Sequence, residues 1–288
     1  MKLRSLLFVP GDRPDRVQTA AGCGADALIL DLEDSVAIEA KDAARREVAA
    51  ALRQGPRPLP YLVRVNPLNS PFLNDDLAAL QGSSPDGIVL PKAEGSASIN
   101  ELLRRMQARG LSCQVLPIAT ETAASVFRLG EYATCASHLL GLTWGAEDLC
   151  AAIGAESPRD ADQRLTAPFE MVRSLALFAA HAAAVPAIDT IFPAIRDLTG
   201  LATHARRAAH DGFTGMMAIH PLQVATINAA FIPSAALLER SRRIVAAFAS
   251  HPGAGVLQID GAMVDAPHLK QAQRILLRAA DEESPPPP

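Results

Sequence analysis

Residues 27–34 read ALILDLED, a short apolar run that ends in three carboxylates. A strand whose successive residues are apolar is typical of a sheet that is covered on both faces. An amphipathic pattern with helical spacing follows at 38–52. This order, a buried strand followed by an amphipathic helix, predicts a parallel α/β fold.

The same unit recurs along most of the chain. Eight such units in about 230 residues fit a (β/α)₈ TIM barrel better than an open doubly wound sheet, which is the second possibility. No GxGxxG motif follows the first strand, so a nucleotide-binding open sheet has little support. The predicted strands are 6–9, 27–32, 61–65, 87–91, 113–118, 138–143, 187–192 and 213–219, and the predicted helices are 13–21, 38–52, 74–80, 97–109, 122–129, 163–183, 197–209 and 221–231.

The repeated order of strand and helix ends after the eighth unit. We predict a catalytic barrel over 1–232 and a small C-terminal appendage or lid over 233–281. In the appendage, Ser234 is placed to cap a helix, a loop or short hairpin follows, and a last helix ends the segment. Residues 282–288, EESPPPP, predict a disordered, solvated tail.

Composition excludes several classes of protein. The 288 residues carry 27 Lys and Arg against 31 Asp and Glu, a net charge of −4, which argues against nucleic acid or an anionic membrane as a partner. Four Cys without a CxxC pair argue against a disulfide scaffold or a thiolate zinc site. No apolar run of about 18 residues and no signal peptide are expected. We therefore predict a soluble cytoplasmic enzyme.

Polar residues stand at the ends of the predicted strands, where TIM barrels carry their active sites. Carboxylates that follow the second, fifth and sixth strands would converge on one mouth, which is unfavourable unless a cation binds between them. Oxygen ligands without a Cys/His cluster suit Mg²⁺ or Mn²⁺ rather than zinc. The strand-end residues are Asp31, Glu33, Asp34, Arg64, Asn66, Lys92, Glu121, Trp144, Glu147, Asp148, Asp189 and His220.

Many of these residues could instead have a purely structural role. A buried Arg must be paired, so Arg64 could be only a structural partner of Asp31 or Glu33. Other strand-end residues could also be structural. Asp34 and Glu147 could cap helices, Glu121 could be an acid in the first turn of a helix, His220 could start a helix, Lys92 could lie on the surface and Trp144 could lie in the core. The pairs Arg45/Arg46 and Arg206/Arg207 could lie on solvated helix faces.

Eight segments in this order resemble the citrate lyase beta-subunit-like branch of the HpcH/HpaI aldolase superfamily. The resemblance runs nearly end to end and implies a (β/α)₈ barrel, Mg²⁺, and a homotrimer or hexamer. The segments are RSLLFVPGDRPDR (4–16), LILDLEDSV (28–36), LVRVNPLNS (62–70), GIVLPKAE (87–94), ATETA (119–123), WGAEDL (144–149), GFTGMMAIHPLQ (212–223) and GAMVDAPHLKQA (261–272).

The resemblance also implies a reaction. Members cleave or form the C–C bond of 3-hydroxy-3-carboxyacyl-CoA thioesters of the citramalyl-, malyl- or citryl-CoA type, which gives an acyl-CoA and a 2-oxo acid. Glu121 and Asp148 match the Mg²⁺ ligands, and Arg64 matches the residue that holds the oxygens of the oxo acid. Asp31 and Glu33 are implied to orient Arg64 and the water bound to the metal.

Asp265 matches the acid that malyl-CoA-type members place over the site of a neighbouring subunit. It is our first candidate base, and a metal-bound water held by Asp31 or Glu33 is the second. The sequence departs from the family pattern at Thr120 and Val264, without loss of a functional group. The CoA diphosphate needs basic side chains near the mouth. Arg13, Arg16 and Lys41 follow the first two strands and could serve, although a solvated role fits them equally well.

Four other functions stay open. They are a metal-dependent aldolase of free pyruvate-type acids, a malyl-CoA thioesterase, a beta subunit that is active only within a citrate lyase complex, and a barrel that only binds a metabolite.

Overall fold

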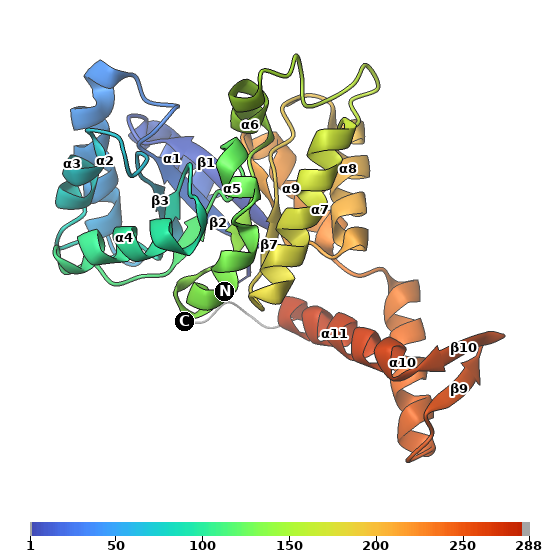
Figure 1. Cartoon of the computed structure of the whole chain (residues 1–288). Helices are drawn as coiled ribbons and strands as arrows, with labels where there is room; N and C mark the ends of the chain where they lie inside the picture. The colour runs from blue at the N-terminus through green and yellow to red at the C-terminus, as the bar shows by residue number, and fades with distance from the viewer. Residues whose placement is uncertain (1, 284–288) are drawn as a thin grey trace. The chain divides into compact units, whose positions relative to one another are not determined.

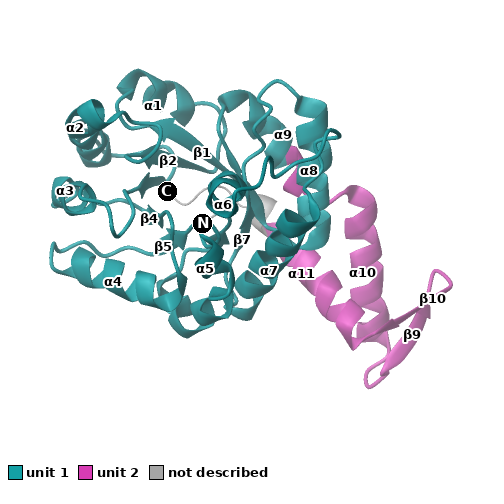
Figure 2. Cartoon of the chain, turned by 45° about the horizontal axis from the view of Figure 1, so that its top comes forward, with its two compact units in different colours: residues 1–228 teal, residues 229–288 magenta. Residues whose placement is uncertain are grey.

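The structure is a computed structural model that describes residues 2–283, with side chains through residue 280. The chain forms two compact units, Met1–Asn228 and Ala229–Pro288 (Figure 2). The division lies inside the helix Pro221–Phe231, a few residues before the predicted barrel boundary at 232.

The first unit is built around a sheet of eight parallel strands. Figure 1 shows helices lying around the strands of this unit. The strand order is β5-β4-β3-β2-β1-β8-β7-β6, and the pairs Val115–Leu139 and Ile118–Thr143 join the two ends of this sheet into a ring. This arrangement confirms the predicted (β/α)₈ barrel. The strands are β1 (Ser5–Pro10), β2 (Ala27–Asp31), β3 (Tyr61–Arg64), β4 (Gly87–Leu90), β5 (Val115–Pro117), β6 (Leu142–Thr143), β7 (Ala187–Asp189) and β8 (Gly215–Ala218).

Helices alternate with these strands. The barrel helices are α1 (Pro14–Ala21), η1 (Ile38–Ala40), α2 (Lys41–Arg53), α3 (Leu73–Ala79), α4 (Gly95–Gln107), α5 (Ala123–Val126), η2 (Leu129–His138), α6 (Ala146–Ile153), α7 (Ala167–Ala182), α8 (Leu198–Asp211) and α9 (Pro221–Phe231).

The sixth unit differs most from its prediction. Residues 138–143 were predicted as a strand, but η2 extends to His138 and β6 has only two residues. The helix α6, which begins directly after β6, was not predicted as a separate element. The long helix begins at Ala167 rather than at 163, because Pro168 is favourable only in the first turn of a helix.

Every second side chain of the strands points into the barrel, and these side chains fill its interior. Leu6 of β1, Ile29 of β2 and Leu62 of β3 belong to one buried apolar cluster. Side chains two residues apart point to the same face of a strand. Asp31 and Arg64, two residues after Ile29 and Leu62, therefore continue the inward-facing rows at the carboxyl ends of their strands.

Asp189 and Trp144 have structural positions. Asp189 is fully buried and pairs with Arg173 at 2.8 Å, and its Oδ1 accepts a hydrogen bond of 2.6 Å from Trp144 Nε1. These contacts put Trp144 in the core. The prediction of a solvated face was wrong for Arg45, which is buried and donates to the carboxylate of Asp76 at 2.8 Å.

The second unit contains two helices and a hairpin. They are α10 (Ala235–Ser250), β9 (Val256–Ile259), β10 (Ala262–Asp265) and α11 (Ala266–Glu283). Ser234 caps α10 as predicted, because its side chain accepts the N–H of Leu237. Of the predicted tail, residues 282 and 283 belong to α11, and residues 284–288 lie outside the described residues.

One segment of the described chain, Pro221–Ser250, is long and apolar enough to cross a membrane by length and composition. No such segment was expected. Its most apolar window has a mean hydropathy of 1.4 and is 22% buried. However, the helix is interrupted at 232–234, so α9 has 11 residues and α10 has 16. Each is shorter than the ~20 residues that a spanning helix needs, so this feature is weak evidence for a membrane span.

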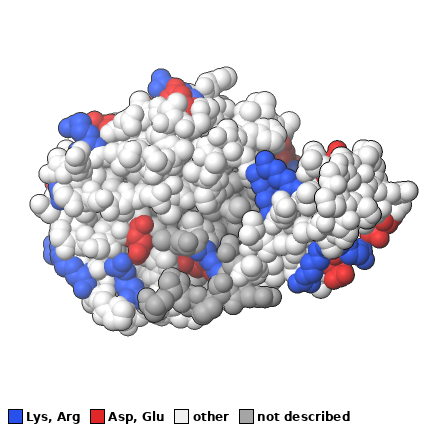
Figure 3. Space-filling model, turned by 90° about the horizontal axis from the view of Figure 1, so that it is seen from below, with Lys and Arg blue, Asp and Glu red and all other residues white. Residues whose placement is uncertain are grey.

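Figure 3 shows one face of the molecule, on which basic and acidic side chains form small separate groups among uncharged residues. This pattern agrees with the nearly balanced charge of the sequence.

The barrel needs a glycine where β8 meets the segment before β1. A Cβ at Gly215 would lie 1.7 Å from the carbonyl oxygen of Leu3. We expect Gly215→Ala to lower the free energy of unfolding by about 3 kcal/mol, because the backbone must move. Urea unfolding measures this change. Gly22→Ala is the control, since its Cβ would meet its nearest atom at 3.8 Å, and an equal loss in both variants would contradict the prediction.

Candidate active site

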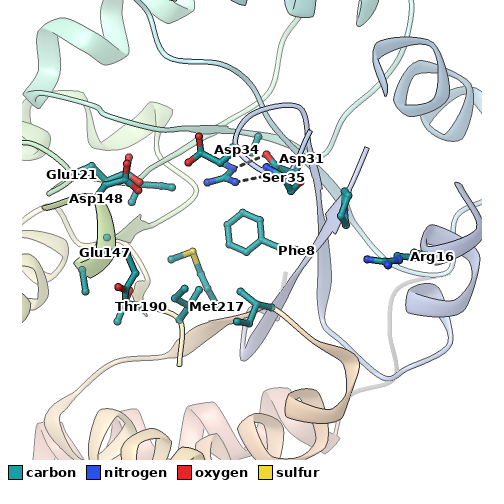
Figure 4. Close-up of a pocket in the computed structure, with 17 residues that line it drawn as sticks. Phe8, Arg16, Asp31, Asp34, Ser35, Glu121, Glu147, Asp148, Thr190 and Met217 are labelled. Atoms are coloured by element: carbon teal, nitrogen blue, oxygen red, sulfur yellow. Dashed lines mark hydrogen bonds and ion pairs between the residues drawn. The ribbon is translucent and has the colours of Figure 1, made fainter. Parts of the chain in front are cut away.

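A cavity of about 340 Å³ opens at the carboxyl ends of the barrel strands. Figure 4 shows Glu121 and Asp148 together at one side of this cavity, with the lining residues Phe8 and Met217 near the middle of the view. Its lining combines carboxylates, the ion pair of Arg64 with Asp31, and apolar side chains. Four predicted site residues, Asp31, Arg64, Glu121 and Asp148, line it, as does Arg16.

Arg64 forms a two-pronged pair with Asp31. Its Nε and Nη2 donate to the two carboxylate oxygens at 2.7 Å each. Its Nη1 lies 3.0 Å from Oε2 of Glu33 in an ion pair that lacks the alignment of a hydrogen bond. The guanidinium also lies 4.7 Å from the ring centroid of Phe8. Because Asp31 uses two of five N–H groups, Arg64 keeps donors for a ligand.

The pKa values in this group reflect burial and pairing. Burial alone raises the pKa of Asp31, but hydrogen bonds and the charge of Arg64 lower it below the ordinary value. Burial raises the pKa of Glu33, against the opposing charges of Arg64 and Lys92. Asp31 therefore stays ionised and holds Arg64 in one orientation.

Glu121 is a buried acid in the loop between β5 and α5. It does not cap the following helix, since Thr122 does so through its side chain. Burial, and then the charges of Asp148 and Glu33, raise the pKa of Glu121 to about 8. A Cβ at Gly145 would lie 2.7 Å from Cγ of Glu121, so a glycine lets this carboxylate reach the cavity.

Lys92 was predicted as a strand-end residue or a surface lysine, without a specific function. Its ammonium lies 3.0 Å from Oε1 of Glu33 and 3.1 Å from Oδ1 of Asp148. Its backbone N–H donates to Oε2 of Glu121. Its φ of 52° is in the left-handed region. The available signal was its position at the end of a strand, the same signal that identified the other residues.

We expect the raised pKa of Glu121 to destabilise the metal-free protein as pH rises. The folded state keeps this proton to about pH 8, whereas the ordinary pKa is 4.5. Between these values the folded state binds more protons, so the free energy of unfolding falls with rising pH and levels off above about pH 8. Thermal unfolding in EDTA from pH 5 to 9 measures this. A wild-type curve parallel to that of Glu121→Gln would contradict the prediction.

The predicted CoA-binding residues lie in different settings. Arg16 lines the cavity, whereas Arg13 is exposed and pairs with Asp15 at 2.9 Å. Lys41 is buried, and its Nζ donates to the carbonyls of Leu32 at 2.7 Å and Glu33 at 3.0 Å. These contacts favour a structural role for Lys41, which holds the turn after β2.

Two further residues have clear local roles. His220 Nδ1 accepts the N–H of Leu222 at the start of α9, which agrees with a helix-start role. Asp265 ends β10 in the second unit, where its carboxylate pairs with the imidazole of His268. Asp265 therefore lies outside the barrel unit, and the role of Asp265 as a base stays a prediction.

The profile of the family described as HpcH/HpaI aldolase/citrate lyase matches residues 4–221. The chain belongs to this family. This result confirms the resemblance found in the sequence. The matched residues include the whole ring of strands and every barrel residue of the site.

Relatives of this HpcH/HpaI family member extend over nearly the whole chain. A citrate lyase subunit beta-like protein of Mycobacterium tuberculosis is 39% identical over 279 residues, which are 96% of each chain. A (3S)-malyl-CoA thioesterase of Cereibacter sphaeroides is 32% identical over 279 residues, 96% of this chain and 94% of the relative.

A solved structure is also similar to this family member. It is the CitE protein of Mycobacterium tuberculosis in complex with magnesium, acetoacetate and coenzyme A. Its TM-score is 0.83 at 36% identity, over 97% of this chain and 98% of the other.

Proposed function

We propose that this family member is a Mg²⁺-dependent oxo-acid lyase that cleaves or forms the C–C bond of a 3-hydroxy-3-carboxyacyl-CoA thioester. The observation that carries the proposal is that one cavity joins two groups, the pair Arg64–Asp31 and the acids Glu121 and Asp148. The first can bind an oxo acid and the second a divalent cation. The magnesium and the acetoacetate, a small oxo acid, in the similar CitE structure support these two assignments, and its coenzyme A supports a CoA thioester as substrate.

The residues of the cavity fit Mg²⁺. Glu121 is buried with a raised pKa beside Asp148, so a bound cation would favour its ionised form. Among the described residues, no cluster of three or more His, Cys, Asp or Glu could hold a metal. Two carboxylates suffice for Mg²⁺, which usually keeps water and substrate oxygens as its other ligands. Mn²⁺ takes the same oxygen donors.

In this proposal the protein holds the reacting acid from two sides. Mg²⁺, when bound, supplies a Lewis acid and a template for the carboxylate and hydroxyl or carbonyl oxygens. Arg64 donates its remaining N–H groups to the carboxylate or to the oxygen that gains charge. Asp31 and Glu33 keep the guanidinium in place. Phe8, Ile118 and Met217 form an apolar side of the cavity.

Cleavage requires a base. The base takes the proton of the hydroxyl group, a carbonyl forms, and the electrons of the broken C–C bond pass to the thioester as an enolate, which is then protonated. Asp265 is our proposed base, on the strength of the motif GAMVD alone. Arg16 remains the proposed contact for the CoA diphosphate because it lines the cavity.

The test is an assay of the purified full-length chain. Citramalyl-CoA, malyl-CoA and citryl-CoA are offered separately with Mg²⁺ or EDTA, and oxo acid and free thiol are measured. We expect an oxo acid without free thiol, lost in EDTA. We also expect citryl-CoA to be the slowest, since the apolar side of the cavity suits hydrogen or methyl better than a second carboxylate.

Other outcomes would replace the proposal. Free thiol without oxo acid indicates a thioesterase, the activity named for the Cereibacter sphaeroides relative. Cleavage of free hydroxy acids without CoA indicates a pyruvate-type aldolase. Activity only with further subunits indicates a component of a citrate lyase complex. Light scattering of the same sample tests the proposed homotrimer or hexamer.

A further inference from the structure

Ion pairs link the acids around the proposed metal ligands to two cations. Asp31 and Glu33 pair with Arg64, and Glu33 and Asp148 pair with Lys92. Arg16 lines the cavity as a further basic side chain. Arg64 is paired with Asp31 and Glu33, so its charge is already balanced by two acids that are not proposed metal ligands. Lys92, by contrast, contacts both Glu121 and Asp148.

Lys92 contacts both proposed ligands through different atoms. Its ammonium pairs with Oδ1 of Asp148, and its backbone N–H donates to Oε2 of Glu121. A backbone contact is fixed by the turn, but an ammonium on a four-carbon stem can move. The side chain of Lys92 is 33% exposed, so it has solvent into which to withdraw.

We propose that Lys92 is the internal cation of this site. Its ammonium neutralises Asp148 and Glu33 when no divalent cation is bound, and it thereby weakens the binding of a divalent cation on its own. A positive charge beside two carboxylates opposes the approach of a second positive charge. The oxygens of the oxo acid then supply the missing attraction, so metal and substrate bind best together. This inference rests on the proposed function, since it takes Glu121 and Asp148 as the metal ligands.

The experiment measures the affinity of the full-length protein for MgCl₂ alone by isothermal titration calorimetry, with no acid or CoA present. We expect Lys92→Met to bind Mg²⁺ about tenfold more tightly than the wild type, because one opposing charge is removed. General damage to the site would weaken binding, so a gain in affinity distinguishes this role from a merely structural one. Lys270→Met, which removes an exposed lysine of α11, is the matched control and should bind as the wild type does.

A second variant separates charge from contact. Lys92→Gln keeps N–H donors near Glu33 and Asp148 without the charge, and we expect the same direction of change. In EDTA, both variants should also melt at a lower temperature than Lys270→Met, since buried acids lose their counter-charge. Unchanged or weaker Mg²⁺ binding in both variants would overturn the inference. If Glu121→Gln binds Mg²⁺ as the wild type does, the proposed metal site itself fails, whatever the result for Lys92.

Discussion

Glu121→Gln is expected to lower kcat/KM for the cleaved acyl-CoA by at least ~10³-fold in saturating Mg²⁺. The amide keeps the shape of the side chain and can still accept the backbone N–H of Lys92. It removes the negative charge from a buried ligand position. A metal acting as Lewis acid is worth several kcal/mol of transition-state stabilisation, and each ~1.4 kcal/mol is a factor of ten in rate.

The measurement is steady-state kinetics of oxo-acid release, with circular dichroism as evidence that the variant is folded. Glu101→Gln is the control, because this glutamate pairs with Arg104 and Arg105 on the surface of α4. We expect it to retain nearly full activity. Full turnover by Glu121→Gln would rule out the proposed metal ligand and with it the lyase mechanism.

Arg64→Met is expected to affect both stability and activity. It would leave Asp31, which is 1% exposed, without its partner. Removing one member of a buried ion pair costs about 3–5 kcal/mol, so we expect a loss of this size in urea unfolding at pH 7. We also expect oxo-acid release to fall by at least ~10³-fold, because the group that holds the carboxylate is gone.

The pH dependence of this loss follows from the lowered pKa of Asp31. A carboxylate with a lowered folded-state pKa contributes stability above its unfolded pKa of about 3.9, and this contribution is lost as pH falls. The stability difference between wild type and Arg64→Met should therefore shrink below about pH 4. Arg46→Met, on the exposed face of α2, is the control. A loss equal to that of the control would show that the pair adds nothing to stability.

The apolar runs and their spacing were sufficient to predict the barrel. Most of the strands are largely apolar on successive positions and most of the helices are amphipathic, and this pattern is local in the chain. The sixth unit was predicted poorly because β6 has two residues and η2 replaces the start of the predicted strand. Such a short strand depends on its neighbours rather than on its own composition.

Strand direction likewise predicted which polar residues would meet. Asp31, Arg64, Glu121 and Asp148 come from four units, and a parallel barrel brings the carboxyl ends of its strands to one rim. The period of two along β2 and β3 then turns Asp31 and Arg64 toward the interior. Strand position placed these residues in a larger group of strand-end residues, and the family resemblance selected them from that group.

The sequence by itself thus determined the fold class and the membership of the acidic rim, because both depend on local periodicity and on the order of the strands. Only the tertiary structure decided which side chains and backbone groups contact each other in the site. It showed that the ammonium of Lys41 donates to two backbone carbonyls and that the ammonium of Lys92 donates to Glu33, 59 positions earlier in the chain. Contacts of this kind depend on backbone angles and on differences of about an ångström between side chains of distant segments. Neither is encoded in the spacing of apolar residues, so the contacts on which the proposed role of Lys92 rests could be found only in the folded chain.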